Sequence, residues 1–283
     1  MCFFTSLVNF TSHVDDPLMV AFADQRASVR GVTCLGDEVF VVLLKAKVVD
    51  VYDVDTLALR RHLPVHVLKK PWDMTSCELN YSLYICEDSK DRVYQVNTSG
   101  KLKRWKVTGI SLSTTAESNL LITFIAPPKV SEFTKDGRLI KEISLQQLGC
   151  DLQHSVLLRP GQFIVCFGEL FGTSGDMVHI INDKGCTQLS YRGPRGSSNS
   201  QMNYPHHLAV DQQGSVLVAD SNNDRILLLS SSLTFVRELI GQNADFLRQP
   251  FRMCFDESRG LLFVGESAKI SRIVVFRVAR DCL

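Results

Sequence analysis

A unit of about forty residues recurs along the chain, and such a repeat limits the possible folds more than any other feature of the sequence. The clearest copy runs from Tyr204 to Gly241 and reads YPHHLAVDQQGSVLVADSNNDRILLLSSSLTFVRELIG. It contains four short apolar runs, and the segments between them, QQG, SNND and SSLT, consist of turn-forming residues. One copy therefore predicts four short antiparallel strands.

Two further copies share this pattern, and three weaker ones complete a series of six. From Leu68 the chain reads LKKPWDMTSCELNYSLYICEDSKDRVYQVNTSGKLKRWKV, and from Leu247 it reads LRQPFRMCFDESRGLLFVGESAKISRIVVFRV. The weaker copies start near Arg30, Gly109 and Leu152. One four-stranded sheet cannot bury both of its faces, but sheets packed around an axis cover one another. The sequence therefore predicts an all-β, six-bladed β-propeller.

We expect a single propeller over residues 1–283, without helices, because no segment shows a 3.6-residue apolar period. The last copy stops after its third strand, whereas PLMVAFADQ, at residues 17–25, precedes the first copy and belongs to no other. This N-terminal segment is expected to close the ring as the outer strand of the last blade, which removes an exposed sheet edge. The expected blades are residues 28–65, 66–107, 108–148, 149–193, 204–241 and 246–278.

Composition is that of a soluble globular protein, with 45% hydrophobic and 22% charged residues. The 31 basic and 30 acidic side chains give none of the basic excess that nucleic-acid binding usually requires. No apolar run approaches the roughly 18 to 20 residues that span a bilayer, so no membrane partner is expected. The nine cysteines include several in apolar runs, among them Cys86, Cys166 and Cys254. Buried, reduced thiols are typical of a cytoplasmic protein, which is the predicted location.

The copies resemble the NHL repeat, most closely in YPHHLAVDQQGSVLVADSNNDRILLL, residues 204–229. The whole is similar to the C-terminal propeller of animal tripartite-motif ubiquitin ligases. In that family RING and B-box zinc sites and a coiled coil precede the propeller, and this sequence contains neither the zinc-ligand spacing nor a heptad repeat. The resemblance implies a platform that recruits proteins, within a ubiquitin-ligase pathway, without catalytic activity of its own.

In the three clearest copies an acidic residue ends the second strand, and an arginine follows after a short loop. Such residues most often hold the loop by bonding to its backbone, so we expect a structural role for them. The pairs are Glu87 with Arg92, Asp220 with Arg225, and Glu266 with Arg272. Between the fourth and fifth copies, GPRGSSNSQMN at residues 193–203 has the composition of a flexible surface linker.

The first strand of each propeller blade lines the central channel, so the starts of these strands surround one channel mouth. Alignment of the copies places six residues at one equivalent position: Gly31, Asp73, Ser111, His154, His207 and Arg252. Aromatic and arginine side chains, which dominate interface hot spots, occur here and one position earlier. We expect a concave protein-binding surface, although these side chains could instead only fill the channel. The candidate binding residues are Arg30, Trp72, Asp73, Gln153, His154, His206, His207, Phe251 and Arg252.

A metal-dependent hydrolase or lyase is one alternative. Asp73, His154 and His207 could form a two-histidine, one-carboxylate site, and propeller enzymes such as the amidating lyases and gluconolactonase-like proteins hold Zn²⁺ or Ca²⁺ at this mouth. Residues on different blades need not converge, however, so we expect solvated histidines, no bound metal and no cofactor. The sequence contains no GxSxG and no phosphate-binding loop, and we expect no catalytic residue.

Single-stranded RNA binding is the other alternative. Basic side chains are interleaved with Trp72 and Trp105, and cationic grooves with stacking aromatics bind single strands. The alternation in KLKRWKV also fits an outer strand whose charges prevent edge pairing. The basic residues are Lys69, Lys70, Lys101, Lys103, Arg104 and Lys106. Neither the identity of a partner nor the oligomeric state can be predicted from the sequence.

Overall fold

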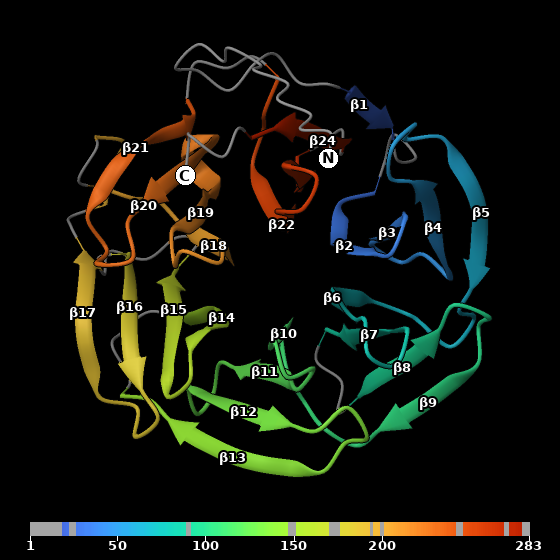
Figure 1. Ribbon diagram of the computed structural model, residues 1–283, viewed down its shortest axis with the longest axis horizontal. Coiled ribbons are helices and arrows are strands. Elements are labelled where there is room, and N and C mark those ends of the chain that lie inside the picture. The colour runs from blue at the N-terminus through green and yellow to red at the C-terminus, as the bar shows by residue number, and fades with distance from the viewer. Residues whose placement is uncertain are drawn as a thin grey trace, which may run out of the picture.

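The structure is a computed structural model, which describes residues 19–22, 27–88, 92–146, 151–169, 176–192, 195–198, 201–241, 246–268 and 272–278. Six four-stranded antiparallel sheets stand around a central axis, so the predicted all-β, six-bladed propeller is confirmed (Figure 1). The predicted absence of helices holds for the described residues apart from one 3-10 turn, Ser221–Asn223. None of the described segments is a helix that could cross a membrane.

The first five blades each use four consecutive strands, with the first strand nearest the axis (Figure 1). Blade 1 contains β2 (Val29–Leu35), β3 (Glu38–Leu43), β4 (Val48–Asp53) and β5 (Leu59–Pro64). Blade 2 contains β6 (Pro71–Cys77), β7 (Ser82–Glu87), β8 (Val93–Asn97) and β9 (Leu102–Trp105). Blade 3 contains β10 (Ser111–Thr114), β11 (Leu120–Phe124), β12 (Lys129–Phe133) and β13 (Leu139–Ser144). Blade 4 contains β14 (Asp151–Arg159), β15 (Gln162–Gly168), β16 (Met177–Asn182) and β17 (Thr187–Arg192). Blade 5 contains β18 (Pro205–Val210), β19 (Val216–Asp220), β20 (Arg225–Leu229) and β21 (Phe235–Ile240).

Blade 6 is assembled from both ends of the chain. Its inner strands are β22 (Pro250–Asp256), β23 (Leu261–Glu266) and β24 (Arg272–Arg277), and its outer strand is β1 (Met19–Phe22). β1 pairs antiparallel with β24, from Met19 opposite Val275 to Phe22 opposite Arg272. The prediction that an N-terminal strand closes the ring is confirmed; residues 17, 18 and 23–25 of the expected segment lie outside the described residues.

The core lies between the blades. Each of six apolar clusters joins two neighbouring sheets, and Phe40 of β3 and Ile85 of β7 lie in one of them. The middle strands β7, β19 and β23 are buried along their whole length. Because both faces of these strands are covered, they form continuous apolar runs without polar alternation.

The acid-and-arginine pairs hold the loops between blades, as the sequence predicted for them. The Asp220 carboxylate accepts hydrogen bonds from the backbone N–H of Asn203 at 2.6 Å and from Arg225 Nε at 2.7 Å. Arg225 is fully buried and donates further to three backbone carbonyls within residues 197–201. The described part of the segment at 193–203 is therefore anchored to blade 5, which its glycine- and serine-rich composition did not predict.

The other two acidic residues act in the same way. Glu266 accepts the backbone N–H of Arg248 at 2.7 Å and pairs with Arg272 at 2.8 Å. Glu87 accepts the backbone N–H groups of Lys69 and Lys70 at 2.6 and 3.1 Å. Each carboxylate thereby ties the end of a second strand to the segment that enters the same blade.

Candidate binding site at the channel mouth

Five of the six first strands begin with a β-bulge, in which one extra residue stands opposite the second strand of the blade. The ladder register shifts around each of these residues. The bulged residues are Arg30, Trp72, Gln153, His206 and Phe251. The next residue along each strand returns to the ladder, and these residues are Gly31, Asp73, His154, His207 and Arg252. The aligned positions therefore occupy the same place in these five blades; Ser111 of blade 3 starts its strand without a bulge.

A bulge leaves a backbone carbonyl without its partner in the ladder, and Arg252 satisfies three of these groups. Its Nε donates to the carbonyl of Arg30 at 3.1 Å, its Nη2 to that of Trp72 at 2.7 Å and its Nη1 to that of Phe251 at 3.1 Å. Nη1 also lies 2.7 Å from His206 Nδ1, the acceptor atom of that ring. One guanidinium thus links first strands of blades 1, 2, 5 and 6 across the channel. We call this arrangement the Arg252 plug.

Asp73 balances the charge of the plug. Its side chain is fully buried, and its Oδ1 lies 2.9 Å from Arg252 Nε and accepts the N–H of Met74 at 2.8 Å. Its Oδ2 accepts the Ser111 hydroxyl at 2.6 Å and the N–H of Leu112 at 2.8 Å. Burial raises the pKa of Asp73, and the charge of Arg252 opposes that rise. With these contacts, each oxygen of the Asp73 carboxylate accepts hydrogen bonds within the protein.

A layer of aromatic and cationic side chains covers the plug. The Arg30 guanidinium lies 4.5 Å from the ring centre of Trp72 and 4.8 Å from that of Phe251. His206 stacks on Phe251 with ring centres 3.7 Å apart, and Tyr204 meets His206 edge-on at 5.2 Å. Burial and the nearby Arg252 charge lower the pKa of Arg30 to about 10, which leaves it cationic at neutral pH. We call these five residues the front platform.

His154 and His207 stack on each other behind the plug, with ring centres 3.8 Å apart. His154 Nδ1 accepts the N–H of Leu208 at 3.3 Å, so its Nε2 carries the proton and faces the carbonyl of Leu112 at 3.3 Å. Burial, aided by the charge of Arg252, lowers the pKa of His154 to about 3. Burial also lowers the pKa of His207 well below its usual value. Both rings are neutral at physiological pH.

The structure brings Asp73, His154 and His207 together, with possible ligand atoms within 4.8 Å of one another. This convergence was not expected from residues on three blades. The donors do not fit a metal ion, however. Both Asp73 oxygens already accept hydrogen bonds, both His154 nitrogens are used, and a guanidinium 2.9 Å from the carboxylate repels a second cation.

Exposure at this mouth differs from the sequence-based expectation. Of the nine candidate residues, only Arg30 and Trp72 are partly exposed, and the rest are buried. Gln153 is among the buried ones and donates to the carbonyl of Gly168 at 2.8 Å. Arg252, expected to face a partner, instead fills the channel because the bulge carbonyls and Asp73 draw it inward. The partly exposed members of the front platform are Arg30, Trp72 and Tyr204, and Tyr204 is the one that alignment of the copies missed.

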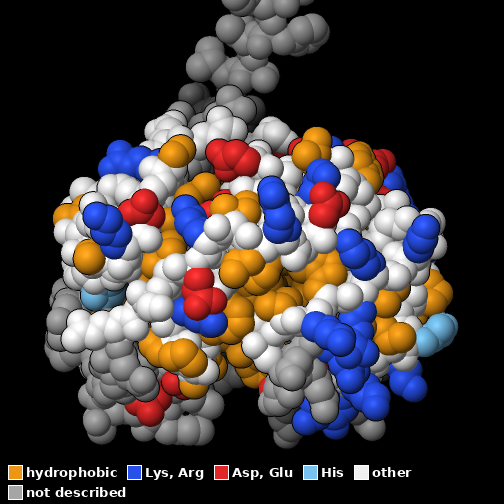
Figure 2. Space-filling view, turned by 90° about the horizontal axis from the view of Figure 1, so that it is seen from below, with side chains coloured by type: hydrophobic (Ala, Val, Ile, Leu, Met, Phe, Trp, Pro, Cys, Tyr) orange, Lys and Arg blue, Asp and Glu red, His pale blue; other side chains and the backbone are white. Residues whose placement is uncertain are grey.

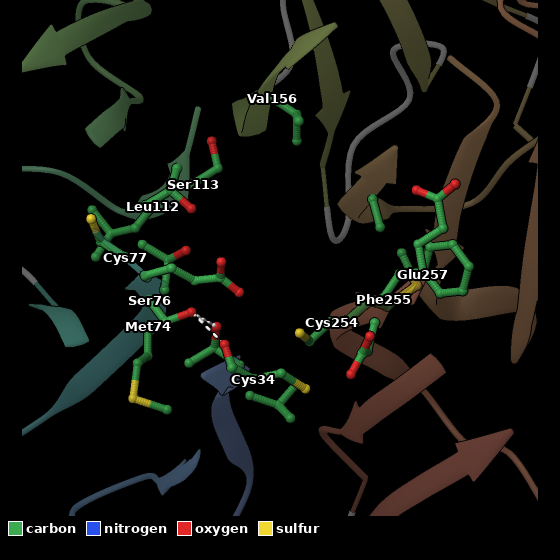
Figure 3. A pocket seen from close by; sticks show the side chains of 18 of the residues that line it. Cys34, Met74, Ser76, Cys77, Leu112, Ser113, Val156, Cys254, Phe255 and Glu257 are labelled. Atoms are coloured by element: carbon green, nitrogen blue, oxygen red, sulfur yellow. Dashed lines mark hydrogen bonds between the residues drawn. The ribbon is translucent and has the colours of Figure 1, made fainter. Parts of the chain in front are cut away.

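The hollow part of the channel lies at its other end, where the first strands finish. A cavity of about 520 Å³ opens there, and Cys34, Ser76, Ser113 and Cys254 line it from four different blades (Figure 3). Its polar groups are largely satisfied within the protein: the Ser76 hydroxyl donates to the carbonyl of Cys34 at 2.6 Å. The concave surface predicted at the strand starts is therefore found at the strand ends, because Arg252 closes the first mouth.

The basic residues considered for RNA do not share a surface with both tryptophans. The KLKRWKV segment forms the outer strand β9, whereas Trp72 belongs to the front platform. Trp105 is only 6% exposed and packs edge-on against Tyr84 at 5.2 Å. The interleaved stacking surface that single-stranded RNA needs is therefore not formed by these residues.

Comparison with known proteins supports the repeat and the fold. Residues 202–227 match the NHL repeat model. This segment is similar in sequence to the NHL repeat. It covers the Tyr204 turn, β18, β19 and the start of β20, including His206, His207 and the Asp220–Arg225 pair. No curated protein sequence matches the chain at a significant level.

Several solved structures have the same fold at low sequence identity. A streptogramin B lyase has a TM-score of 0.63 at 12% identity, over 91% of this chain and 96% of that one. A hydrazine synthase chain from Kuenenia stuttgartiensis has a TM-score of 0.62 at 13% identity, over 89% and 84%. A chain of a nidogen/laminin complex has a TM-score of 0.59 at 13% identity, over 80% and 84%. Enzymes and a protein-binding propeller thus share this architecture, and function must be argued from the site.

Proposed function

We propose that this propeller is a non-catalytic platform that binds a protein partner through the front platform. The observation that carries the proposal is the Arg252 plug. Arg252 pairs with Asp73, the carboxylate that metal or acid–base chemistry would need, and its contacts with His206 and the Trp72 carbonyl lie directly beneath the aromatic layer. The partly exposed side chains of Arg30, Trp72 and Tyr204 are of the residue types that contribute most binding energy in protein interfaces.

Two further observations support this proposal, and a third supports the proposed location. The NHL repeat at 202–227 contributes Tyr204 and His206 to the front platform. The nidogen/laminin complex provides a propeller of this shape within a protein–protein assembly. The six described cysteines are free thiols, which supports a reducing, cytoplasmic location. The three structures named above are not ubiquitin ligases, and the proposal does not extend to that pathway.

Replacing Trp72 should remove partner binding without unfolding the protein. Trp72→Ala deletes a partly exposed ring that supports Arg30, whereas the matched control Tyr81→Ala deletes an exposed ring elsewhere on blade 2. With the full chain as bait and quantitative mass spectrometry of captured proteins, at least one partner should fall tenfold or more with Trp72→Ala. The same partner should remain with Tyr81→Ala, and thermal melting should report the folded state of both variants.

Two results would contradict the proposal. One is that every captured protein binds the Trp72→Ala variant as well as it binds the wild type. The other is sub-micromolar, salt-sensitive binding of an oligouridine that is lost in a Lys101→Ala/Lys103→Ala variant and unaffected by Trp72→Ala. Because phosphate contacts release counterions, true RNA binding must weaken steeply with salt. That second result would favour single-stranded RNA as the ligand.

A further inference from the structure

Charge is distributed unevenly around the rim of the propeller. Residues 101–144 contain eight lysines and arginines against four acidic residues, whereas the whole chain has 31 against 30. This segment forms β9, the outer strand of blade 2, and all of blade 3. The nearly neutral total therefore conceals one basic sector.

A groove lies within this sector, between the end of blade 2 and the face of blade 3. Its volume is about 510 Å³. Figure 2 shows hydrophobic side chains at the bottom of a hollow in this rim, with lysine and arginine side chains around it. We call it the rim groove, and its lining residues are Arg104, Lys106, Val107, Thr108, Phe124, Lys129, Ser131, Phe133, Leu139 and Glu142.

Two of the cations that line the rim groove are available to a ligand. Lys129 is already paired with Glu142 at 2.8 Å. Arg104 and Lys106, by contrast, form no ion pair with any described carboxylate, and both are exposed. An uncompensated pair of cations beside a hollow attracts anionic groups and selects against basic ones.

The apolar floor favours a peptide over a nucleic acid. Leu139 is 50% exposed and lines the groove together with the partly exposed Phe124 and Phe133, so the groove presents apolar surface beside its cations. The two aromatic rings are already engaged, since Lys129 Nζ lies 4.7 Å from the ring centre of Phe124 and Phe133 packs against Trp105 at 6.4 Å. Base stacking would compete with these ring contacts, whereas an aliphatic or aromatic peptide side chain can cover Leu139 without disturbing them.

We propose that the rim groove binds an acidic peptide segment of a partner protein. Carboxylates of that segment lie against Arg104 and Lys106, and an apolar side chain between them covers Leu139. This surface is separate from the front platform, because it is built from β9, the residues just after it, and β11, β12 and β13, and contains none of the first-strand residues at the channel mouth.

A random twelve-residue peptide library displayed on phage, selected on the immobilised full chain, tests this proposal. Selected peptides should combine several Asp or Glu residues with Leu, Ile or Phe. Fluorescence anisotropy of the best peptides should show at least tenfold weaker binding to Arg104→Glu/Lys106→Glu and several-fold weaker binding to Leu139→Ser. A matched variant, Lys45→Glu/Lys47→Glu, reverses the same number of exposed charges on blade 1 and should bind as the wild type does.

Several outcomes would overturn the proposal. One is that the selected peptides lack acidic residues, and another is that no peptide is selected. A third is that the blade 1 variant loses as much binding as the groove variant, which would mean that net charge alone attracts the peptides. Oligouridine that competes the peptides away and binds more tightly than they do would identify the groove as an RNA site instead. Trp72→Ala should leave peptide binding unchanged, so failure here is distinguishable from failure of the front platform.

Discussion

At the scale of single residues, the side chains in the channel are arranged around backbone carbonyls that the β-bulges leave without hydrogen-bond partners in the sheet. Bulges at Arg30, Trp72 and Phe251 present carbonyl groups to the channel that no strand can satisfy. Unpaired buried carbonyls are costly, and an arginine, with five donors in one plane, can satisfy several at once. Arg252 therefore turns inward, and its charge in turn requires the buried carboxylate of Asp73.

Removing one partner of this buried pair should cost far more than removing both. Arg252→Met leaves Asp73 charged, buried and without its cation, and should destabilise the protein by about 3–5 kcal/mol. Asp73→Asn in the same chain removes the stranded charge, so the double variant should recover a substantial part of that loss. Urea unfolding of the wild type, both single variants and the double variant measures the coupling. Additive losses would show that the two groups do not depend on each other.

The sequence predicted where these residues lie in the blades, but it did not predict which groups surround their side chains. The repeat places Asp73, His154, His207 and Arg252 at one position of the blade because alignment follows the strand period. The direction of the Arg252 side chain depends instead on carbonyls from three blades and on the His206 ring of a fourth, which no local pattern encodes. The same limit applies to the cavity at the far end, whose lining comes from residues scattered over all six first strands.

At the scale of elements, the fold depends on a four-residue strand from the other end of the chain. β1 supplies the fourth strand of blade 6, and without it β24 would present an open edge. The sequence revealed this because the last repeat lacks its outer strand and one apolar segment is left over. The described part of the segment at 193–203 was harder to predict, since the buried Arg225 of the next blade anchors it and its own composition gives no sign of this.

Deleting residues 1–25 should therefore open the ring. The loss of one strand's hydrogen bonds and packing should lower the melting temperature by about 10 °C or more, given that each kcal/mol is worth about 2–4 °C in a protein of this size. The exposed edge of β24 should also promote aggregation, visible by light scattering. Deletion of residues 1–16 is the control, because it keeps β1. A shorter chain that stays as stable and soluble as the control would refute the role of this strand.

At the scale of the whole molecule, burial of three imidazoles links folding to pH. His154, His206 and His207 are buried around one permanent cation, Arg252, and this environment lowers the pKa of each. In the unfolded chain these groups return to a pKa of about 6.5. The unfolded state thus binds more protons than the folded state below that pH, and stability is complete only above it.

Stability should accordingly fall as the pH drops from 7 towards 5. Each histidine can contribute up to about 1.4 kcal/mol of destabilisation per pH unit below about 6.5. Asp220, whose pKa burial raises to about 6, acts in the opposite direction because its folded form takes up a proton more readily. A histidine variant separates the imidazole contribution to the pH dependence of stability from the opposing contribution of Asp220. His207→Gln should reduce the slope of unfolding free energy against pH, whereas the exposed His66→Gln should leave it unchanged. Urea unfolding at several pH values measures both slopes, and identical slopes for His207→Gln and the wild type would mean that His207 is protonated in the folded protein.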